Sequence, residues 1–177
     1  DGGTNTGSLV PVLVSGGHNW ASVDAARSGT ITGLHACGVT TAGEAYCWGY
    51  NGNGQLGDGT TTDRYTPVLV SGGLDWVSVS GGTGTYDTCG VTTAGDAYCW
   101  GEGADGKLGN ARDTDRYAPV LVSGGLTWES ITTGRFHACG LLKSIGVGYC
   151  WGSNPYGELG DQTNTSSSVP VRVGGNW

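Results

Sequence analysis

Short hydrophobic runs alternate with glycine-rich polar stretches along the whole chain. Strand-like runs of about five residues recur, such as WVSVS at 76–80, WESIT at 128–132 and AYCWG at 97–101. Runs of this length bounded by glycine and polar turn residues are typical of β-strands. The pattern predicts about four strands in each period of about fifty residues.

The same order of segments returns several times. PVLVSGG begins at residues 11, 67 and 119, and a weaker copy, PVRVGG, begins at 170. A tryptophan follows each copy, at Trp20, Trp76, Trp128 and Trp177. A fixed period of this size indicates an array of repeats. We therefore divide the chain into a partial repeat (1–19), repeat one (20–75), repeat two (76–127) and a segment containing repeat three and the start of the next (128–177).

Each repeat contains two cysteines about ten positions apart. CGVTTAGEAYCWG at 37–49 returns as CGVTTAGDAYCWG at 89–101 and, with one residue inserted, as CGLLKSIGVGYCWG at 139–152. If the two cysteines face each other across a hairpin, each tyrosine and tryptophan opposes a small residue in all three copies. The first two copies then leave a Thr-Ala-Gly loop, whose glycine suits the left-handed position of a three-residue hairpin connection.

Facing residues of a hairpin lie within reach of a disulfide. The register predicts three disulfides: Cys37 with Cys47, Cys89 with Cys99, and Cys139 with Cys150. Such bonds persist in oxidising compartments, so we expect a secreted or cell-surface protein. A zinc site at His35 and His137 is the rival interpretation. Repeat two has Asp87 at that position, and no repeat offers four ligands, so we expect no metal.

Composition narrows the class of protein further. The chain has 36 glycines in 177 residues and only 13% charged residues, which favours an all-β protein with many turns. Eight basic and 15 acidic residues give a net charge of −7, which argues against a nucleic-acid partner. No apolar run approaches the roughly 18 residues of a membrane span. No basic-then-apolar segment opens the sequence, which starts at Asp1 and contains no methionine, so we expect a processed product or a portion of a longer precursor.

The ordered motif resembles the repeat of the regulator of chromosome condensation family, most clearly in WGYNGNGQLGDG at 48–59. The resemblance implies four strands per repeat and, in that family, a propeller of seven repeats. We therefore expect an all-β fold of β-propeller blades, each with four antiparallel strands. About three repeats cannot close a ring alone. The cysteine pairs resemble those of exported bacterial members, and the acidic charge argues against guanine-nucleotide exchange or chromatin binding.

Several positions are candidates for an interface. Asp63-Arg64-Tyr65 and Asp115-Arg116-Tyr117 recur before the PVLV segment, and either an interface or local ion pairing explains them. The valines of the first and last such segments, Val12, Val14, Val171 and Val173, lie near the open ends. Residues 24–32 form an insertion that is either a binding loop or, as we favour, a neutral surface excursion. A calcium loop through Asn51, Asn53 and Asp58 competes with side-chain capping of a turn, which we favour.

No motif for catalysis or cofactor binding stands out, so we expect no enzymatic activity and no cofactor. The preferred hypothesis is an extracellular scaffold that associates head-to-tail into a fibre or surface assembly, since open strand edges and ends invite self-association. The alternative is a secreted recognition module that binds a protein or glycan through its loop face.

Overall fold

The chain folds into three four-stranded antiparallel sheets that follow one another along the sequence. The structure is a computed structural model and describes residues 7–25, 34–81 and 86–174. The first sheet contains β1 (Trp20–Ala25), β2 (His35–Thr40), β3 (Ala45–Gly49) and β4 (Arg64–Leu69); the second contains β5 (Trp76–Ser80), β6 (Asp87–Thr92), β7 (Ala97–Gly101) and β8 (Arg116–Leu121); the third contains β9 (Trp128–Thr133), β10 (His137–Leu142), β11 (Gly148–Gly152) and β12 (Ser167–Arg172). A three-residue 3-10 helix, η1 (Ala104–Gly106), follows β7.

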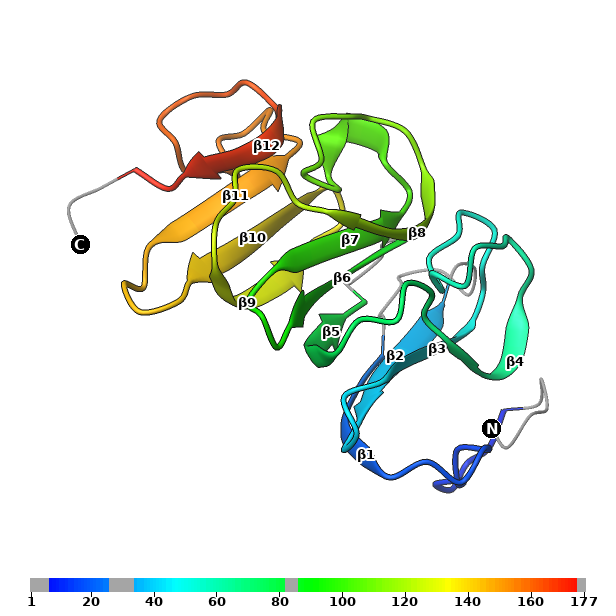
Figure 1. The fold of residues 1–177 in the computed structure, drawn as a ribbon. Coiled ribbons are helices and arrows are strands. Elements are labelled where there is room, and N and C mark those ends of the chain that lie inside the picture. The colour runs from blue at the N-terminus through cyan, green and yellow to red at the C-terminus, as the bar shows by residue number, and fades with distance from the viewer. Residues whose placement is uncertain (1–6, 26–33, 82–85, 175–177) are drawn as a thin grey trace.

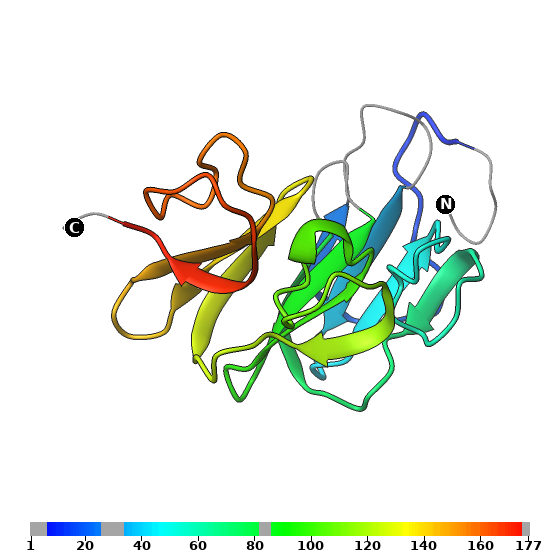
Figure 2. The ribbon, with the colours of Figure 1, turned by 90° about the horizontal axis from the view of Figure 1, so that it is seen from above.

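Each strand pairs with the next strand in sequence, so each sheet is a meander that forms one blade. The blades lie in a row, with β1–β4 at one end and β9–β12 at the other (Figures 1 and 2). The row is open, and the predicted all-β architecture of four-stranded blades is confirmed.

The hairpin register is the one that the sequence predicts. Cys37 pairs with Cys47, Gly38 with Tyr46 and Ala36 with Trp48, and the other two hairpins repeat these pairs. The loop glycine of the first hairpin, Gly43, has φ of +86°, the left-handed conformation that the connection requires. Each hairpin carries a disulfide between its facing cysteines, with Cα atoms 4.0 Å apart.

The first copy of the PVLV segment does not form a strand. Residues 11–14 repeat the PVLV segment that belongs to β4 and β8, yet they are not a strand in the structure. An outer strand needs the third strand of its own blade as a hydrogen-bonding partner, and β3 already pairs with β4. The insertion at 24–32 lies outside the described residues from position 26 onward.

The hydrophobic core lies between neighbouring blades. One cluster joins the cysteine-bearing face of the first blade to Trp76, Val79 and Trp100 of the second. The second cluster repeats this arrangement between the second blade and Trp128, Ile131 and Trp151 of the third. Every blade therefore presents a cysteine face on one side and a tryptophan face on the other.

The tryptophan before each hairpin packs against the glycine that follows the first cysteine. A Cβ atom added to Gly38 would lie 2.8 Å from the Trp20 ring, and Gly90 and Gly140 meet Trp76 and Trp128 in the same way. The cysteine of each Cys-Gly pair therefore forms a disulfide on one face of the strand, and the glycine leaves room for an indole ring on the other face.

Candidate functional site

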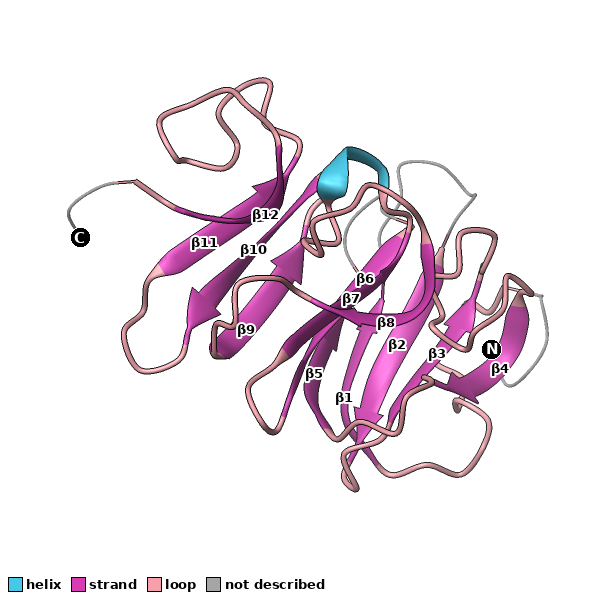
Figure 3. Cartoon of the chain, turned by 45° about the horizontal axis from the view of Figure 1, so that its top comes forward, coloured by secondary structure: helices cyan, strands magenta, loops and turns pink. Residues whose placement is uncertain are grey.

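The connection between blades is the structural feature that repeats most closely. The glycine-rich loop after the third strand of one blade lies against the third and fourth strands of the next. We call this contact the joint. Figure 3 shows η1 within the second of these loops, and η1 contacts β11 and β12.

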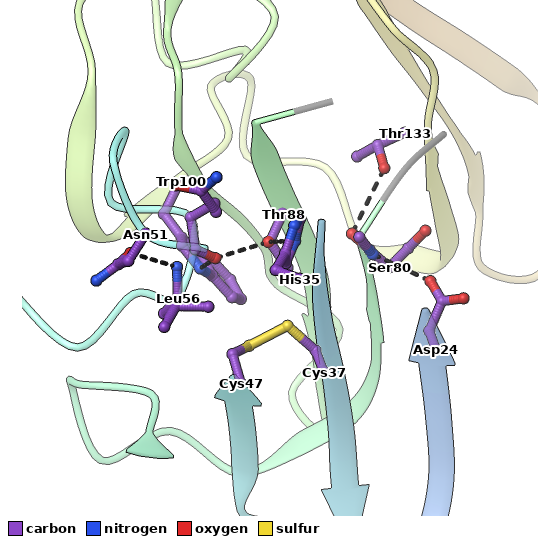
Figure 4. Close-up of a disulfide and its surroundings, with 12 residues drawn as sticks. Asp24, His35, Cys37, Cys47, Asn51, Leu56, Ser80, Thr88, Trp100 and Thr133 are labelled. Carbon is purple, nitrogen blue, oxygen red and sulfur yellow. Dashed lines mark hydrogen bonds between the residues drawn. A yellow bond between two sulfur atoms is a disulfide. The ribbon is translucent and has the colours of Figure 1, made fainter. Parts of the chain in front are cut away.

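In the first joint, indole and hydroxyl groups hold a backbone carbonyl. Trp100 Nε1 donates to the Gln55 carbonyl at 2.9 Å, and Thr88 Oγ1 donates to the same oxygen at 2.8 Å. His35 Nε2 lies 2.9 Å from Thr88 Oγ1 and completes a buried chain of hydrogen bonds between the two blades (Figure 4). Gly59 N–H donates to the Tyr117 carbonyl at 2.8 Å.

The second joint uses the same backbone contacts with different side chains. Trp151 Nε1 donates to the Lys107 carbonyl at 2.9 Å, and Ala111 N–H donates to the Ser168 carbonyl at 2.9 Å. Ala138 occupies the position of Thr88. The sequence did not reveal these joints, because a donor on a strand and a carbonyl in a loop of another repeat leave no local pattern.

Each loop is fixed from inside by an amide side chain. Asn51 is fully buried; its Oδ1 accepts from Leu56 N–H at 3.0 Å, and its Nδ2 donates to the Thr60 and Thr62 carbonyls at 3.1 Å. Asn154 caps the third loop in the same manner. These contacts support side-chain capping of the turn for Asn51. No group of three or more residues suited to a metal ion occurs among residues 7–25, 34–81 and 86–174.

Asp58 holds the end of the first loop. Its carboxylate accepts two hydrogen bonds from Arg64, at 2.9 Å from Nε and 2.8 Å from Nη2, and one from the Thr60 hydroxyl at 2.7 Å. Burial opposes ionisation of Asp58, but the bonds from Thr60 and Arg64 outweigh it and hold the pKa of this carboxyl below its ordinary value.

A charged group is buried in the second blade. Lys107 Nζ lies 3.3 Å from Asp87 Oδ1, each side chain is 1% exposed, and Glu102 also forms an ion pair with Lys107. Gln55 and His35 occupy the positions of Lys107 and Asp87 in the first blade. The joints therefore share a backbone geometry but differ in the polar residues beneath it.

The cysteine face of the third blade is open. Leu141 is 45% exposed, whereas Val39 and Val91, at the same position in the first two blades, are each 2% exposed. A groove on this face is lined by Leu141, the disulfide of Cys139 and Cys150, and Val173. Glu158 is exposed, although its counterparts Gln55 and Lys107 are buried.

The tryptophan face of the first blade is open as well. Val23 is 52% exposed, whereas its counterparts Val79 and Ile131 are each 8% exposed. Trp20 and Trp48 are only half-buried, although Trp76 and Trp100 are 3% and 0% exposed. Within the described ranges, Trp48 Nε1 has no hydrogen-bond acceptor. The residues exposed at the two ends are thus the counterparts of residues buried on the two sides of a complete joint.

The remaining interface candidates have different surroundings. Arg64 is held by Asp58, as local ion pairing requires, whereas the Arg116 guanidinium donates to the Asp115 carbonyl and forms no salt bridge with the described residues. Tyr117 lies over Gly54 in the first joint and is 47% exposed, and Tyr65, its counterpart on the first blade, is 57% exposed. Val12 is 46% exposed, and Val14, Val171 and Val173 are half-buried.

Comparison with known proteins identifies the repeat. The sequence profile of the Regulator of chromosome condensation (RCC1) repeat matches residues 42–85 and 94–141. The chain belongs to the RCC1 repeat family. Among curated RCC1-type relatives, the human E3 ubiquitin-protein ligase HERC2 is 33% identical over 97% of this chain, and the Ultraviolet-B receptor UVR8 of Arabidopsis thaliana is 38% identical over 78% of it. The chain spans 4% of HERC2 and 32% of UVR8.

Solved structures agree on the fold. Human WBSCR16 superposes with a TM-score of 0.69 at 22% identity, covering 78% of this chain and 35% of WBSCR16. Prp20p of Saccharomyces cerevisiae superposes with a TM-score of 0.68 at 19% identity, covering 80% of this chain and 36% of Prp20p. The described residues of the RCC1 array contain no helix that is long and apolar enough to cross a membrane.

Proposed function

We propose that this RCC1 array is a non-enzymatic protein-binding scaffold whose two open ends bind each other in separate copies, head-to-tail. The observation that carries the proposal is the pair of open faces. The residues exposed at each end are the counterparts of those that are buried inside the two complete joints. Burial of apolar surface is the main favourable term in association, and the matched faces supply it.

The internal joints indicate how the contact would form. By analogy with the first joint, Trp48 of one copy donates to the Glu158 carbonyl of another, and Tyr65 lies over Gly157. A Cβ atom at Gly157 would meet nothing closer than 3.8 Å, so this seat is open. The third loop is already folded, because Leu159 N–H donates to Asn154 Oδ1 at 2.9 Å. A preorganised loop loses little conformational freedom on binding.

A contact between unlike faces leaves one face free on each copy, so it extends into a fibre or surface assembly unless the rotation closes a ring. Two copies of three blades would form a ring of six, within the range of about four to eight blades known for propellers. The cellular setting that we propose is extracellular or at the cell surface, supported by the three disulfides.

Protein partners are also consistent with the relatives. Yeast Prp20p has binding properties toward Gsp1p and histones, and Kap60 forms a complex with yeast RCC1. Electrostatics disfavour nucleic acid as a partner of this chain, because the net charge is −7. We propose no catalytic activity for this chain. All of its cysteines are paired in disulfides, so none is a free thiol nucleophile.

The test is the mass of the unreduced protein in solution, measured by sedimentation at several concentrations. We expect Val23→Asp and Leu141→Asp each to keep the mass at that of the monomer at every concentration, because each places a charge on one open face. The matched control is Val77→Asp, which changes a valine that is 57% exposed and lies outside both end faces. A mixture of the two end variants should form a dimer and nothing larger, since each retains one functional face.

Wild-type protein that stays monomeric at every concentration would refute self-association. A closed dimer would retain the head-to-tail contact and overturn the fibre.

A further inference from the structure

The second joint contains a polar pocket of about 440 Å³ between the loop of the second blade and β12. Its walls include Asp105, Arg112 and Asp113 on the loop side and Ser166 and Ser168 on the β12 side. This pocket is independent of the two open ends, because both of its walls belong to an internal joint.

One wall of the pocket holds a serine at the position where the first joint holds a tyrosine. In the first joint, the Tyr117 ring packs against Gly54, where an added Cβ atom would lie 2.4 Å from Tyr117 Cδ1, and its outer side stays exposed. Ser168 is the counterpart of Tyr117 in the third blade, and a Cβ atom on Gly106 would lie 2.6 Å from Ser168 Cβ. The backbones approach each other closely in both joints. The second joint lacks a phenol ring over the loop, and the space beside Ser168 is open.

We infer that this pocket binds a neutral sugar residue, in addition to the proposed association of the ends. Its volume falls within the range of about 300 to 1,000 Å³ that is usual for small-molecule sites. Carboxylates accept hydrogen bonds, the guanidinium of Arg112 donates them, and serine hydroxyls do both. A ligand that matches such a mixed set must carry many groups that both donate and accept, as the hydroxyls of a sugar ring do.

Charge argues against the other polar ligands. Two aspartates and one arginine give the pocket walls a formal charge of −1, and the chain carries −7 in all, so phosphates and acidic sugars are repelled. A metal ion would need more ligands than Asp105 and Asp113, and the described parts of the chain hold no group of three suitable residues.

The local hydrogen bonds leave the pocket side chains able to bind. The Arg112 backbone N–H bonds to Asn110 Oδ1 at 3.1 Å, which holds the loop, and the guanidinium forms no salt bridge with the described residues. Ser166 Oγ accepts from Asn154 N–H at 3.1 Å and retains its own proton for donation. The Ser168 carbonyl accepts from Ala111 N–H, so the joint itself does not use the Ser168 hydroxyl.

The experiment measures binding of a panel of neutral probes to the unreduced protein by calorimetry and by ligand-detected NMR. The probes are the methyl glycosides of glucose, galactose, mannose and N-acetylglucosamine, together with their short β- and α-linked oligomers. Wild-type protein should bind at least one probe. Ser168→Tyr should weaken this binding by at least about tenfold, because it places in the pocket wall the ring that lies over Gly54 in the first joint.

Two variants make the result specific. Tyr65→Ser removes a tyrosine from the same strand position of the first blade, away from the pocket, and should leave binding unchanged. Val23→Asp should also retain sugar binding while it blocks association, so failure of one proposal does not imply failure of the other. Absence of binding by every probe, or equal binding by wild type and a folded Ser168→Tyr variant, would overturn the sugar site.

Discussion

At the scale of single residues, the three repeats act as controls for one another, because the same backbone position holds different side chains. The position that follows Asp58, Asn110 and Asp161 in the three glycine-rich loops shows this most clearly. Gly59, Ala111 and Gln162 all have positive φ, at +82°, +61° and +67°. Only glycine adopts this conformation without a steric penalty.

Ala111→Gly should therefore stabilise the protein by about 0.5 to 1 kcal/mol, the left-handed penalty of alanine less the extra freedom of glycine in the unfolded chain. The reciprocal change, Gly59→Ala, should destabilise by about 1 kcal/mol. A Cβ atom at Gly59 meets nothing within 4 Å, so this change tests the backbone alone. Urea unfolding of both variants measures the difference, and a destabilising Ala111→Gly would contradict the interpretation.

The ion pair of Asp58 predicts how stability depends on pH. The pKa of Asp58 is lowered in the folded protein, so its stabilisation is fully present above the unfolded value of about 3.9 and is lost as the pH falls through the lower folded value. Asp58→Asn should lower the free energy of unfolding at neutral pH and reduce its loss on acidification.

Asparagine is compatible with this site, because Asn110 occupies the same position in the second blade. The measurement is the free energy of unfolding from neutral pH to about pH 3, across the unfolded pKa. Identical pH profiles for wild type and Asp58→Asn would show that the bonds from Arg64 do not favour the ionised form in the folded state.

At the scale of elements, the joint predicts that Trp100 contributes more to stability than Trp48, its counterpart in the first blade. Trp100 is fully buried and donates to the Gln55 carbonyl, whereas Trp48 is half-buried and, in the described part of the chain, has no acceptor. Trp100→Phe should cost about 2 to 3 kcal/mol, from the lost hydrogen bond and the partly filled space.

Trp48→Phe is the matched control. It should lower the free energy of unfolding by less than about 1 kcal/mol, because the side chain at position 48 is already partly exposed to solvent. Guanidinium unfolding of the two variants at a concentration where wild type is monomeric provides the comparison. Equal losses would mean that the joint contributes nothing beyond the packing of an indole in its own blade.

The sequence predicted the elements more completely than the contacts between them. Strand pairing within each hairpin followed from Cys37, Cys47 and the small residues opposite the aromatics, because register is a local property of two adjacent segments. The division into repeats at 20, 76 and 128 remains a prediction, although the three sheets begin at these tryptophans.

The joints and the proposed sugar pocket could not be predicted from local sequence patterns. Trp100 finds its acceptor 45 residues earlier in the chain, and the acceptor is a backbone carbonyl, which every residue possesses. The pocket lies beside Ser168, which occupies the position of Tyr117. When the repeats are aligned, however, the sequence does show that position 168 holds serine where position 117 holds tyrosine.

At the scale of the whole molecule, the array is a chain of nearest-neighbour contacts, and stability should vary along it. All six residues of β6 are buried, because both faces of the middle blade are covered. In β1, no residue is fully buried. Local opening requires less free energy where fewer apolar contacts break.

Amide hydrogen exchange followed by mass spectrometry should therefore be slowest in β6 and β7 and faster in β1 to β3 and β10 to β12. Measured at low and high protein concentration, the experiment also reports on the ends. If the open faces associate, exchange in β1 to β3 and in β10 and β11 should slow as concentration rises, while β6 and β7 stay unchanged. The Val23→Asp variant should lose this concentration dependence. Equal protection of all three blades in that variant would mean that the blades unfold as one unit, so that burial in a joint does not set local stability.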